Sequence, residues 1–170
     1  CSEAQQKIIL VMGDSISAAY GMSLQDGWVA LVNEDLKDSE SNYRIINASI
    51  SGETSAGGRR RLTNLLNKYS PDMVIIELGG NDGLRGYPIS QLETNLIAMI
   101  QSSFSFGARV ILLPMEIPPN YGPRYTSRFR NAFKKASLET GAILGPFILK
   151  DIALNKSLMQ SDGIHPRKSA

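Results

Sequence analysis

The sequence predicts an α/β fold, a three-layer α/β/α sandwich built on a parallel sheet of five strands. Five short apolar runs, rich in β-branched residues, alternate with four segments whose apolar residues have helical spacing. Nearly continuous apolar runs are typical of parallel strands that are covered on both faces. Each parallel crossover needs a helix, and right-handed crossovers place the helices on the faces of the sheet.

The strands are predicted from aliphatic runs of strand length. The first run, residues 7–12, reads Lys-Ile-Ile-Leu-Val-Met, and the second run lies at residues 43–48. The third and fourth runs lie at residues 73–78 and 109–113, and a weaker fifth run at 142–144.

The helices are predicted from apolar residues that recur three and four positions apart. In chain order, the four apolar faces consist of Trp28, Leu31, Val32 and Leu36; Leu62, Leu65, Leu66 and Tyr69; Leu92, Leu96, Met99 and Ile100; and Phe129, Ala132, Phe133 and Ala136. We expect each of these faces to pack on the sheet.

Composition indicates an ordinary soluble domain. The 170 residues predict a single domain over residues 1–170, in which residues 1–6 form a polar tether. The 18 basic and 16 acidic residues give a net charge of +2, so we expect no nucleic-acid partner. One cysteine and one histidine are too few for a structural zinc site, and we expect neither a metal nor a cofactor. No apolar run approaches the roughly 18 residues that a membrane-spanning helix needs.

The first residue is Cys1 and not methionine. One hypothesis is that Cys1 is the lipid-bearing first residue of a bacterial lipoprotein, which would attach the protein to a membrane surface. The alternative is that residue 1 is an arbitrary boundary of the sequence.

Chemically active residues follow the predicted strands at one edge of the sheet. Ser15 comes just after the first strand, Gly52 after the second and Asn81 after the third, while Asp162 and His165 lie beyond the fifth. Open parallel sheets bind ligands at this edge. A serine hydroxyl becomes a nucleophile when an imidazole takes its proton and a carboxylate orients the imidazole. Ser15, His165 and Asp162 provide these three groups.

Each of these residues also has an ordinary structural explanation. Ser15 could cap a helix, Gly52 could adopt a backbone angle that other residues resist, and Asn81 could hold a turn. Asp14 is expected to order its turn by hydrogen bonds to nearby amides and is given no proton-transfer role. Ser17 is a second hydroxyl in this segment, which we interpret as a cap or loop residue.

Four separated blocks of the sequence resemble the motifs of the SGNH, or GDSL, hydrolase superfamily. The blocks span residues 13–17, 47–54, 77–84 and 162–166, and they occur in the family's order. The sequence looks like the bacterial branch of multifunctional thioesterases, lysophospholipases and arylesterases, whose Asn-Tyr-Gly segment is recognisable at residues 120–122. The resemblance implies a flavodoxin-like SGNH hydrolase fold and an exported, periplasmic protein.

Carried over residue by residue, the resemblance implies that Ser15 is the nucleophile, His165 the general base and then acid, and Asp162 its orienting carboxylate. It also implies an oxyanion hole made by the backbone N–H groups of Ser15 and Gly52 and the side-chain amide of Asn81. Donors of this kind stabilise the negative oxygen of a tetrahedral acyl intermediate.

Two loops are candidates for binding the acyl group of a substrate. Residues 83–88 place bulky side chains between glycines, and residues 115–121 follow the fourth predicted strand. Glycines permit movement while the side chains offer apolar surface. The predicted contacts are Leu84, Tyr87, Pro88, Met115, Ile117 and Tyr121. The alternative is that both segments are ordinary connecting turns.

The sequence departs from the family after His165, where only five residues follow. Relatives usually continue into a final amphipathic helix that packs on the sheet, so this helix is expected to be missing. Its absence should uncover apolar sheet surface and loosen the loop that carries Asp162 and His165.

Taken together, we expect a cofactor-free serine hydrolase, monomeric, that cleaves esters or thioesters of small molecules, lysophospholipids included, through an acyl-serine intermediate. The alternatives are a carbohydrate O-deacetylase on the same scaffold, a flavodoxin-like binding protein and a catalytically silent lipoprotein. Association with a membrane surface is left open.

Overall fold

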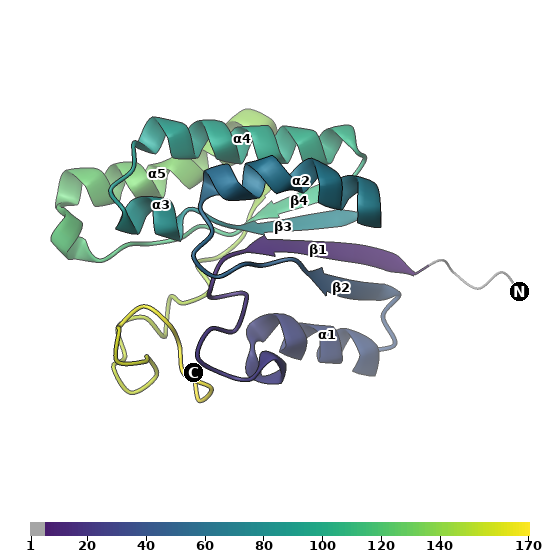
Figure 1. Cartoon of the computed structure of the whole chain (residues 1–170), viewed down its shortest axis with the longest axis horizontal. Helices are drawn as coiled ribbons and strands as arrows, with labels where there is room; N and C mark the ends of the chain where they lie inside the picture. Colours follow the sequence, from purple (N-terminus) through teal and green to yellow (C-terminus); the bar gives the residue numbers. More distant parts are fainter. Residues whose placement is uncertain (1–5) are drawn as a thin grey trace, which may run out of the picture.

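A parallel sheet of five strands forms the centre of the structure (Figure 1). The computed structural model describes residues 6–170, so Cys1 and most of the predicted tether lie outside the described residues. The strands are β1 (Lys7–Gly13), β2 (Tyr43–Asn47), β3 (Met73–Glu77), β4 (Arg109–Leu112) and β5 (Ile143–Leu144). The predicted α/β fold with five parallel strands is confirmed, and each boundary differs from the expected one by at most one residue.

The strand order is β2-β1-β3-β4-β5, which places β1 between β2 and β3. In β1, Leu10 is paired with Ile46 on one side and with Val74 on the other. The chain leaves β1 toward β2 and then returns to build the sheet on the opposite side, so the strand order reverses between β1 and β3. Parallel α/β sheets bind ligands in the crevice at such a reversal, at the carboxyl ends of the strands.

Helices lie on both faces of the sheet, as expected for three layers (Figure 1). One face is covered by α2 (Ser55–Tyr69), α4 (Ile89–Ser105) and α5 (Pro123–Thr140), and the other by α1 (Trp28–Asp38) and the C-terminal segment. A short helix that the sequence did not predict, α3 (Gly80–Leu84), follows β3. Single 3-10 turns occur at Leu24–Asp26 (η1) and Pro119–Tyr121 (η2).

The main core lies between the sheet and the helices α2, α4 and α5. Alternate strand residues such as Leu10, Val74 and Leu112 belong to it and are fully buried. The predicted faces of the three helices supply the other side, with Phe129 and Phe133 in edge-to-face contact at a centroid distance of 5.4 Å. Burial of each such side chain stabilises the fold by roughly 1.5–3 kcal/mol. Apolar residues therefore occupy the buried positions of these helices, and their spacing predicts the helices from the sequence.

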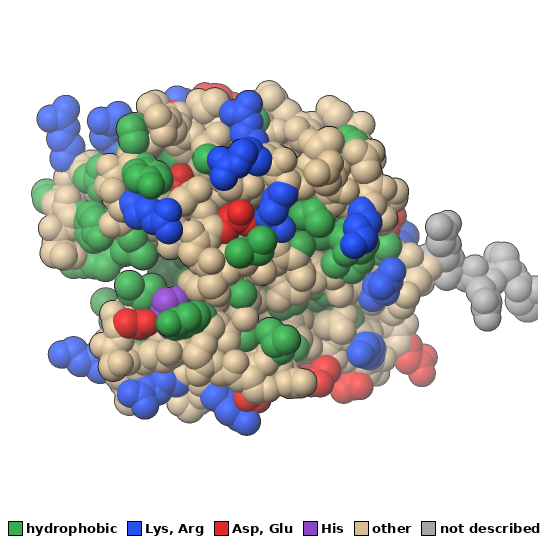
Figure 2. All heavy atoms as spheres, in the orientation of Figure 1, with side chains coloured by type: hydrophobic (Ala, Val, Ile, Leu, Met, Phe, Trp, Pro, Cys, Tyr) green, Lys and Arg blue, Asp and Glu red, His purple; other side chains and the backbone are tan. Residues whose placement is uncertain are grey.

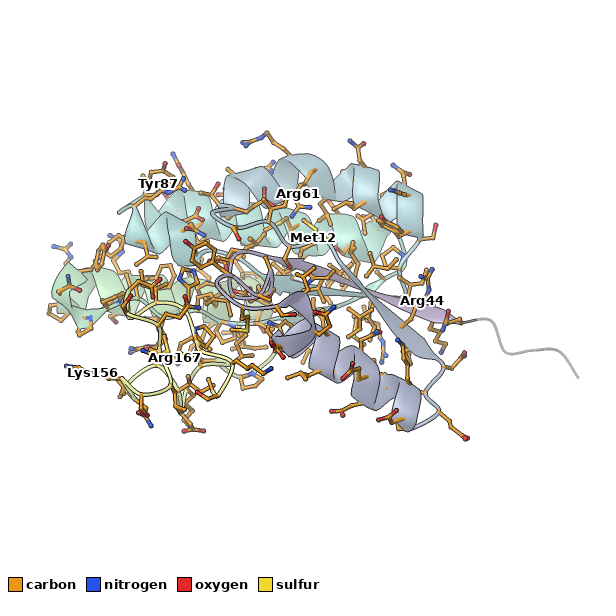
Figure 3. The ribbon with its side chains drawn as sticks, turned by 60° about the horizontal axis from the view of Figure 1, so that its bottom comes forward. Met12, Arg44, Arg61, Tyr87, Lys156 and Arg167 are labelled. Atoms are coloured by element: carbon orange, nitrogen blue, oxygen red, sulfur yellow. The ribbon has the colours of Figure 1, made fainter. Side chains whose placement is uncertain are left out.

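The opposite face of the sheet is less completely covered, and here the expectation for α1 was partly wrong. Leu31 and Val32 were predicted to pack on the sheet but are 49% and 40% exposed. Ile75 and Ile111 are half-buried, and Ile143 of the edge strand is 57% exposed. Figure 3 shows this face between α1 and the C-terminal segment. Helix α1 lies against β2 at one side of the sheet, so two apolar residues of its face have no neighbour to bury them.

Residues 145–170 form turns with a single bridge, between Met159 and Pro166, and no helix among the described residues follows α5. Within residues 6–170, no helix combines the length and the apolar character that crossing a membrane requires.

Candidate active site

A cavity of about 500 Å³ opens at the carboxyl ends of the strands. It lies between the C-terminal segment and the loops that follow β1, β3 and β4. Figure 2 shows the hollow, with the side chain of the chain's one histidine (purple) at its edge. The lining is mostly apolar, and its polar part is concentrated around Asp14, Ser15, Asn81 and His165.

The structure brings Ser15, His165 and Asp162 into a continuous chain of hydrogen bonds. His165 Nε2 lies 2.7 Å from Ser15 Oγ, and His165 Nδ1 lies 2.6 Å from Asp162 Oδ2. With the proton on Nδ1, the ring donates to the carboxylate and accepts from the serine hydroxyl. This arrangement can take the proton of the Ser15 hydroxyl and hold the resulting imidazolium beside a carboxylate.

A tight loop over residues 158–167 positions the imidazole. The N–H of Gln160 donates to the carbonyl of His165 over 2.7 Å, and the N–H of Arg167 donates to that of Leu158 over 2.7 Å. Gly163 turns the chain between them with φ +67°, a left-handed conformation that favours glycine. The Gln160 side chain donates to the carbonyl of Tyr20 over 2.8 Å, which fastens this loop to the segment after β1.

Tyr20 also packs against the imidazole. The centroids of its ring and of the His165 ring are 4.5 Å apart. This contact limits the orientations that the imidazole can adopt, and sequence reasoning missed it because Tyr20 and His165 are far apart in the chain.

Asp162 is held as a carboxylate by its neighbours. Burial acts to raise the pKa of Asp162, but hydrogen bonds from the His165 ring and from the N–H groups of Ile164 and His165 outweigh it and lower the pKa to about 2. The two backbone bonds, at 2.9 and 3.1 Å, end on Oδ1 and leave Oδ2 to the ring. Asp162 is therefore ionised throughout the neutral pH range.

Close packing at the end of β1 fixes the direction of Ser15. A side chain at Gly13 would place its Cβ 2.6 Å from the Oγ of Ser17 and 2.8 Å from a carboxylate oxygen of Glu77, so only glycine fits there. Asp14 Oδ1 accepts from the N–H of Ile16 over 3.0 Å, which is the turn-ordering role expected for Asp14. Ser17 is buried, donates to Glu77 Oε2 over 2.5 Å and does not line the cavity.

Asp14 and Glu77 form a buried acidic pair beneath the nucleophile candidate. Burial raises the pKa of Asp14 to about 6 and raises the pKa of Glu77 well above its ordinary value, and the negative charge of Asp14 raises the pKa of Glu77 further. Glu77 Oε1 is buried and has no hydrogen-bond partner among the described residues. With its pKa at about 6, Asp14 carries a negative charge above that pH.

Asn81 joins the loops after β2 and β3. Its Nδ2 donates to the carbonyl of Glu53 over 3.0 Å and to Asp14 Oδ2 over 3.3 Å. The Gly52–Glu53 turn therefore lies beside Asn81, and Gly52 has φ +79°. Gly52 itself does not line the cavity, whereas Ser15 and Asn81 do. An oxyanion could accept a hydrogen bond from Asn81 Nδ2, which would then be shared with Asp14 Oδ2.

A further buried carboxylate, Asp82 of α3, connects the loop after β3 to the start of α2. Asp82 accepts from the N–H and the hydroxyl of Ser55, over 2.8 and 2.6 Å, at the beginning of α2.

The predicted substrate contacts divide into two groups. Leu84, Met115 and Ile117 line the cavity. Tyr87, Pro88 and Tyr121 do not line it, and their contact with a substrate stays a prediction. Their loops are tied together elsewhere, because the Tyr121 hydroxyl donates to the carbonyl of Leu84 over 2.7 Å.

Sequence reasoning also missed one wall of the cavity. This wall consists of apolar residues from the C-terminal segment, with one lysine: Phe147, Leu149, Lys150, Ala153, Leu154, Met159 and Ile164. The apolar composition of residues 147–154 was a usable signal, but the segment has no strand or helix period that would have assigned it a face.

No group of three or more His, Cys, Asp or Glu side chains that could hold a metal ion occurs among residues 6–170.

Comparison with known proteins places this geometry in a family. The model of the GDSL-like lipase/acylhydrolase family matches residues 11–169. The chain belongs to the GDSL-like lipase/acylhydrolase family. Esterase TesA of Pseudomonas aeruginosa is 48% identical over 168 residues, which cover 99% of this chain and 84% of TesA. Thioesterase 1/protease 1/lysophospholipase L1 of Escherichia coli K12 is 41% identical over 95% of this chain and 76% of its own.

The solved structures agree with this assignment to the GDSL-like family. A psychrotrophic esterase, EstA from Pseudoalteromonas sp., has a TM-score of 0.94 at 48% identity and covers 96% of this chain and 90% of its own. The SGNH-hydrolase family esterase AlinE4 has a TM-score of 0.88 at 33% identity, over 98% of this chain and 89% of its own. The protein is therefore an SGNH-type serine hydrolase with esterase function.

The buried charge of Asp14 predicts a dependence of stability on pH. Because folding raises the pKa of Asp14 from 3.8 to about 6, protonated Asp14 favours the folded state. This contribution to the free energy of unfolding is complete below pH 3.8 and is lost as the pH rises through about 6. Asp14→Asn removes this charge but keeps an acceptor for the Ile16 N–H. Relative to the wild type, the variant should gain free energy of unfolding between pH 4 and 7.5, by at most about 3 kcal/mol. Urea unfolding at several pH values measures this.

The same substitution at the exposed Asp38 is the matched control for loss of one carboxylate. A difference between Asp14→Asn and wild type that stays constant from pH 4 to pH 7.5 would contradict the buried charge.

Proposed function

We propose that this protein hydrolyses carboxylic esters and thioesters of acyl chains through an acyl-Ser15 intermediate. The observation that carries the proposal is the 2.7 Å contact between Ser15 Oγ and His165 Nε2 at the end of a mostly apolar cavity. Such a cavity suits an acyl chain, and the polar end suits its carbonyl. The names of the relatives, an esterase and a thioesterase/lysophospholipase, support this substrate class.

In the proposed first step, Ser15 Oγ attacks the acyl carbonyl while His165 Nε2 takes the hydroxyl proton. The tetrahedral intermediate carries its negative charge on the former carbonyl oxygen, toward the Asn81 amide and the N–H groups of Ser15 and Gly52. His165 then donates its proton to the departing alcohol or thiol, which leaves acyl-Ser15. Water, deprotonated by His165, releases the carboxylic acid and regenerates the serine.

Two of the alternatives lack this support. A flavodoxin-like binding protein needs no serine beside an imidazole, and a phosphate would meet the buried negative charge of Asp14 next to the cavity. A carbohydrate O-deacetylase shares the chemistry, but the lining residues beyond the polar end are chiefly Leu, Ile, Met, Phe and Pro, which favours an acyl chain over a sugar. Periplasmic location, a monomeric state and lipid on Cys1 stay predictions.

Ser15→Ala should lower kcat for a short-chain aryl ester by at least about 1,000-fold, because among the described residues Ser15 has the hydroxyl that is hydrogen-bonded to His165 Nε2. The variant should also lose covalent labelling by a fluorophosphonate, which intact-protein mass spectrometry detects. Ser17→Ala is the matched control and should still be labelled at Ser15. Labelling of the Ser15→Ala protein at another serine would overturn the proposed nucleophile.

Asn81→Ala should lower kcat about 100- to 1,000-fold with little change in KM, since the amide is used most when charge develops on the carbonyl oxygen. Steady-state kinetics with a short aryl ester separate the two constants. Asn67→Ala, an exposed position on α2, is the control. A rise in KM at unchanged kcat would instead assign Asn81 to ground-state binding.

Activity should fall in acid, because a protonated imidazole cannot accept the serine proton. Asp162, with its pKa of about 2, stays ionised, but burial raises the pKa of Asp14 to about 6, so Asp14 is a second group that can cause such a fall. The pH dependence of kcat/KM is therefore measured for the wild type and for Asp14→Asn. The fall should persist in Asp14→Asn, and a flat profile in that variant would assign it to Asp14.

A further inference from the structure

The mouth of the cavity has two lips, and both expose apolar or aromatic side chains. On one lip, Leu154 lines the cavity yet is 94% exposed. On the other, Pro118 and Pro119 are exposed cavity-lining residues, next to Tyr121, which is 36% exposed. A leucine that projects almost entirely into solvent is not stabilised by any packing within the described chain.

Hydrogen bonds hold the second lip, which contains Tyr121 and is called the tyrosine lip below, in place. The Tyr121 hydroxyl donates to the carbonyl of Leu84, and the Tyr125 hydroxyl donates to the carbonyl of Tyr87 over 2.8 Å. The rings of Tyr121 and Tyr125 are stacked, with centroids 6.4 Å apart. Tyrosines with an apolar ring and a satisfied hydroxyl are the side chains typical of a membrane–water interface.

Basic side chains surround both lips. Lys150 and Lys156 belong to the lip that contains Leu154, called the leucine lip below. Arg124 and Arg128 lie beside the paired tyrosines Tyr121 and Tyr125. All four are exposed, and none forms an ion pair with another described residue. Figure 3 shows Lys156 at the outer end of the C-terminal segment.

Acidic residues are scarce at the mouth and gather elsewhere. At the mouth, Glu116 is paired with Arg130 and Asp162 is bonded to His165. The remaining acidic residue there is the exposed Asp151. Acidic residues of α1 and its C-terminal end are exposed instead: Glu34, Asp35, Asp38 and Glu40. In Figure 2, Lys and Arg side chains (blue) flank the hollow above and below, while several acidic side chains (red) lie at the lower right, where Figure 1 places α1.

We propose that the mouth of the cavity is a docking surface for an anionic phospholipid bilayer, with Leu154 inserted between headgroups and the four basic residues against lipid phosphates. The separation of charge would turn the mouth toward a negative surface. Bound in this way, the cavity would open directly onto the acyl chains of the bilayer. An acidic protein would satisfy the basic residues but would not need the exposed leucine, so the bilayer fits both observations.

The test is co-sedimentation with vesicles of phosphatidylcholine alone and of phosphatidylcholine mixed with phosphatidylglycerol. The Ser15→Ala protein is used so that no lipid is hydrolysed, which makes the result independent of the proposed catalytic roles. It should bind the anionic vesicles, bind the neutral ones far more weakly, and lose binding as salt is raised. Added to Ser15→Ala, Leu154→Asn should weaken binding about tenfold or more, the ratio expected for one buried leucine.

Lys150→Glu combined with Lys156→Glu should weaken binding to anionic vesicles by a further tenfold or more, at about 1 kcal/mol for each basic residue lost near the surface. The matched controls are Leu138→Asn, which changes an 84% exposed leucine near the other end of α5, and Lys37→Glu on α1. Both controls should bind as the parent does. Absence of binding to anionic vesicles at low salt would overturn the proposal.

Two other outcomes would also overturn it. Equal losses in the Leu154 variant and its Leu138 control would show that the leucine lip does not enter the bilayer. Binding to anionic vesicles that depends on the lysines but is unaffected by Leu154→Asn would show attraction by charge alone, without insertion of the leucine.

Discussion

One contact, between Ser15 Oγ and His165 Nε2, joins positions that are 150 residues apart in the chain. Its geometry depends on nearly every other feature of the structure. The central position of β1 brings Ser15 to the point where the strand order reverses, and the whole series of crossovers is needed before the chain returns to that edge with His165. Because a proton transfers efficiently only over hydrogen-bond distance, errors of an ångström in this path would disable the chemistry.

The same region contains the least favourable electrostatics in the protein. Two carboxyl groups, Asp14 and Glu77, are buried beneath the nucleophile candidate, and no Lys or Arg of residues 6–170 forms an ion pair with either. The cost is reduced because the N–H of Ile16 and the Asn81 amide donate hydrogen bonds to Asp14. Gly13 is required by the same packing, since its missing side chain provides the space in which Ser17 and Glu77 meet. The buried acidic pair lowers the local stability, and the close packing around it keeps the backbone beneath Ser15 rigid.

Much of the fold was predictable because its signals are local. The strands and the apolar faces of α2, α4 and α5 follow from period and composition, and the site residues follow from their position after each strand. What could not be predicted depends on contacts between distant segments. Tyr20 against His165, Asp82 against Ser55, and the exposure of Leu31 and Val32 are determined by tertiary neighbours. Loop sequence does not reveal which way a side chain points, so it could not separate Leu84, which lines the cavity, from Tyr87 and Tyr121, which do not.

The C-terminal segment can lose its native contacts more easily than the rest of the protein. It supplies the imidazole, its carboxylate partner and one cavity wall, yet it contains only turns and the single Met159–Pro166 bridge. Segments with so little regular structure open at a smaller free-energy cost than a sheet does. Catalytic competence and global foldedness are therefore separable properties: local opening of this segment would take His165 away from Ser15 while the sheet and helices α1 to α5 stay folded.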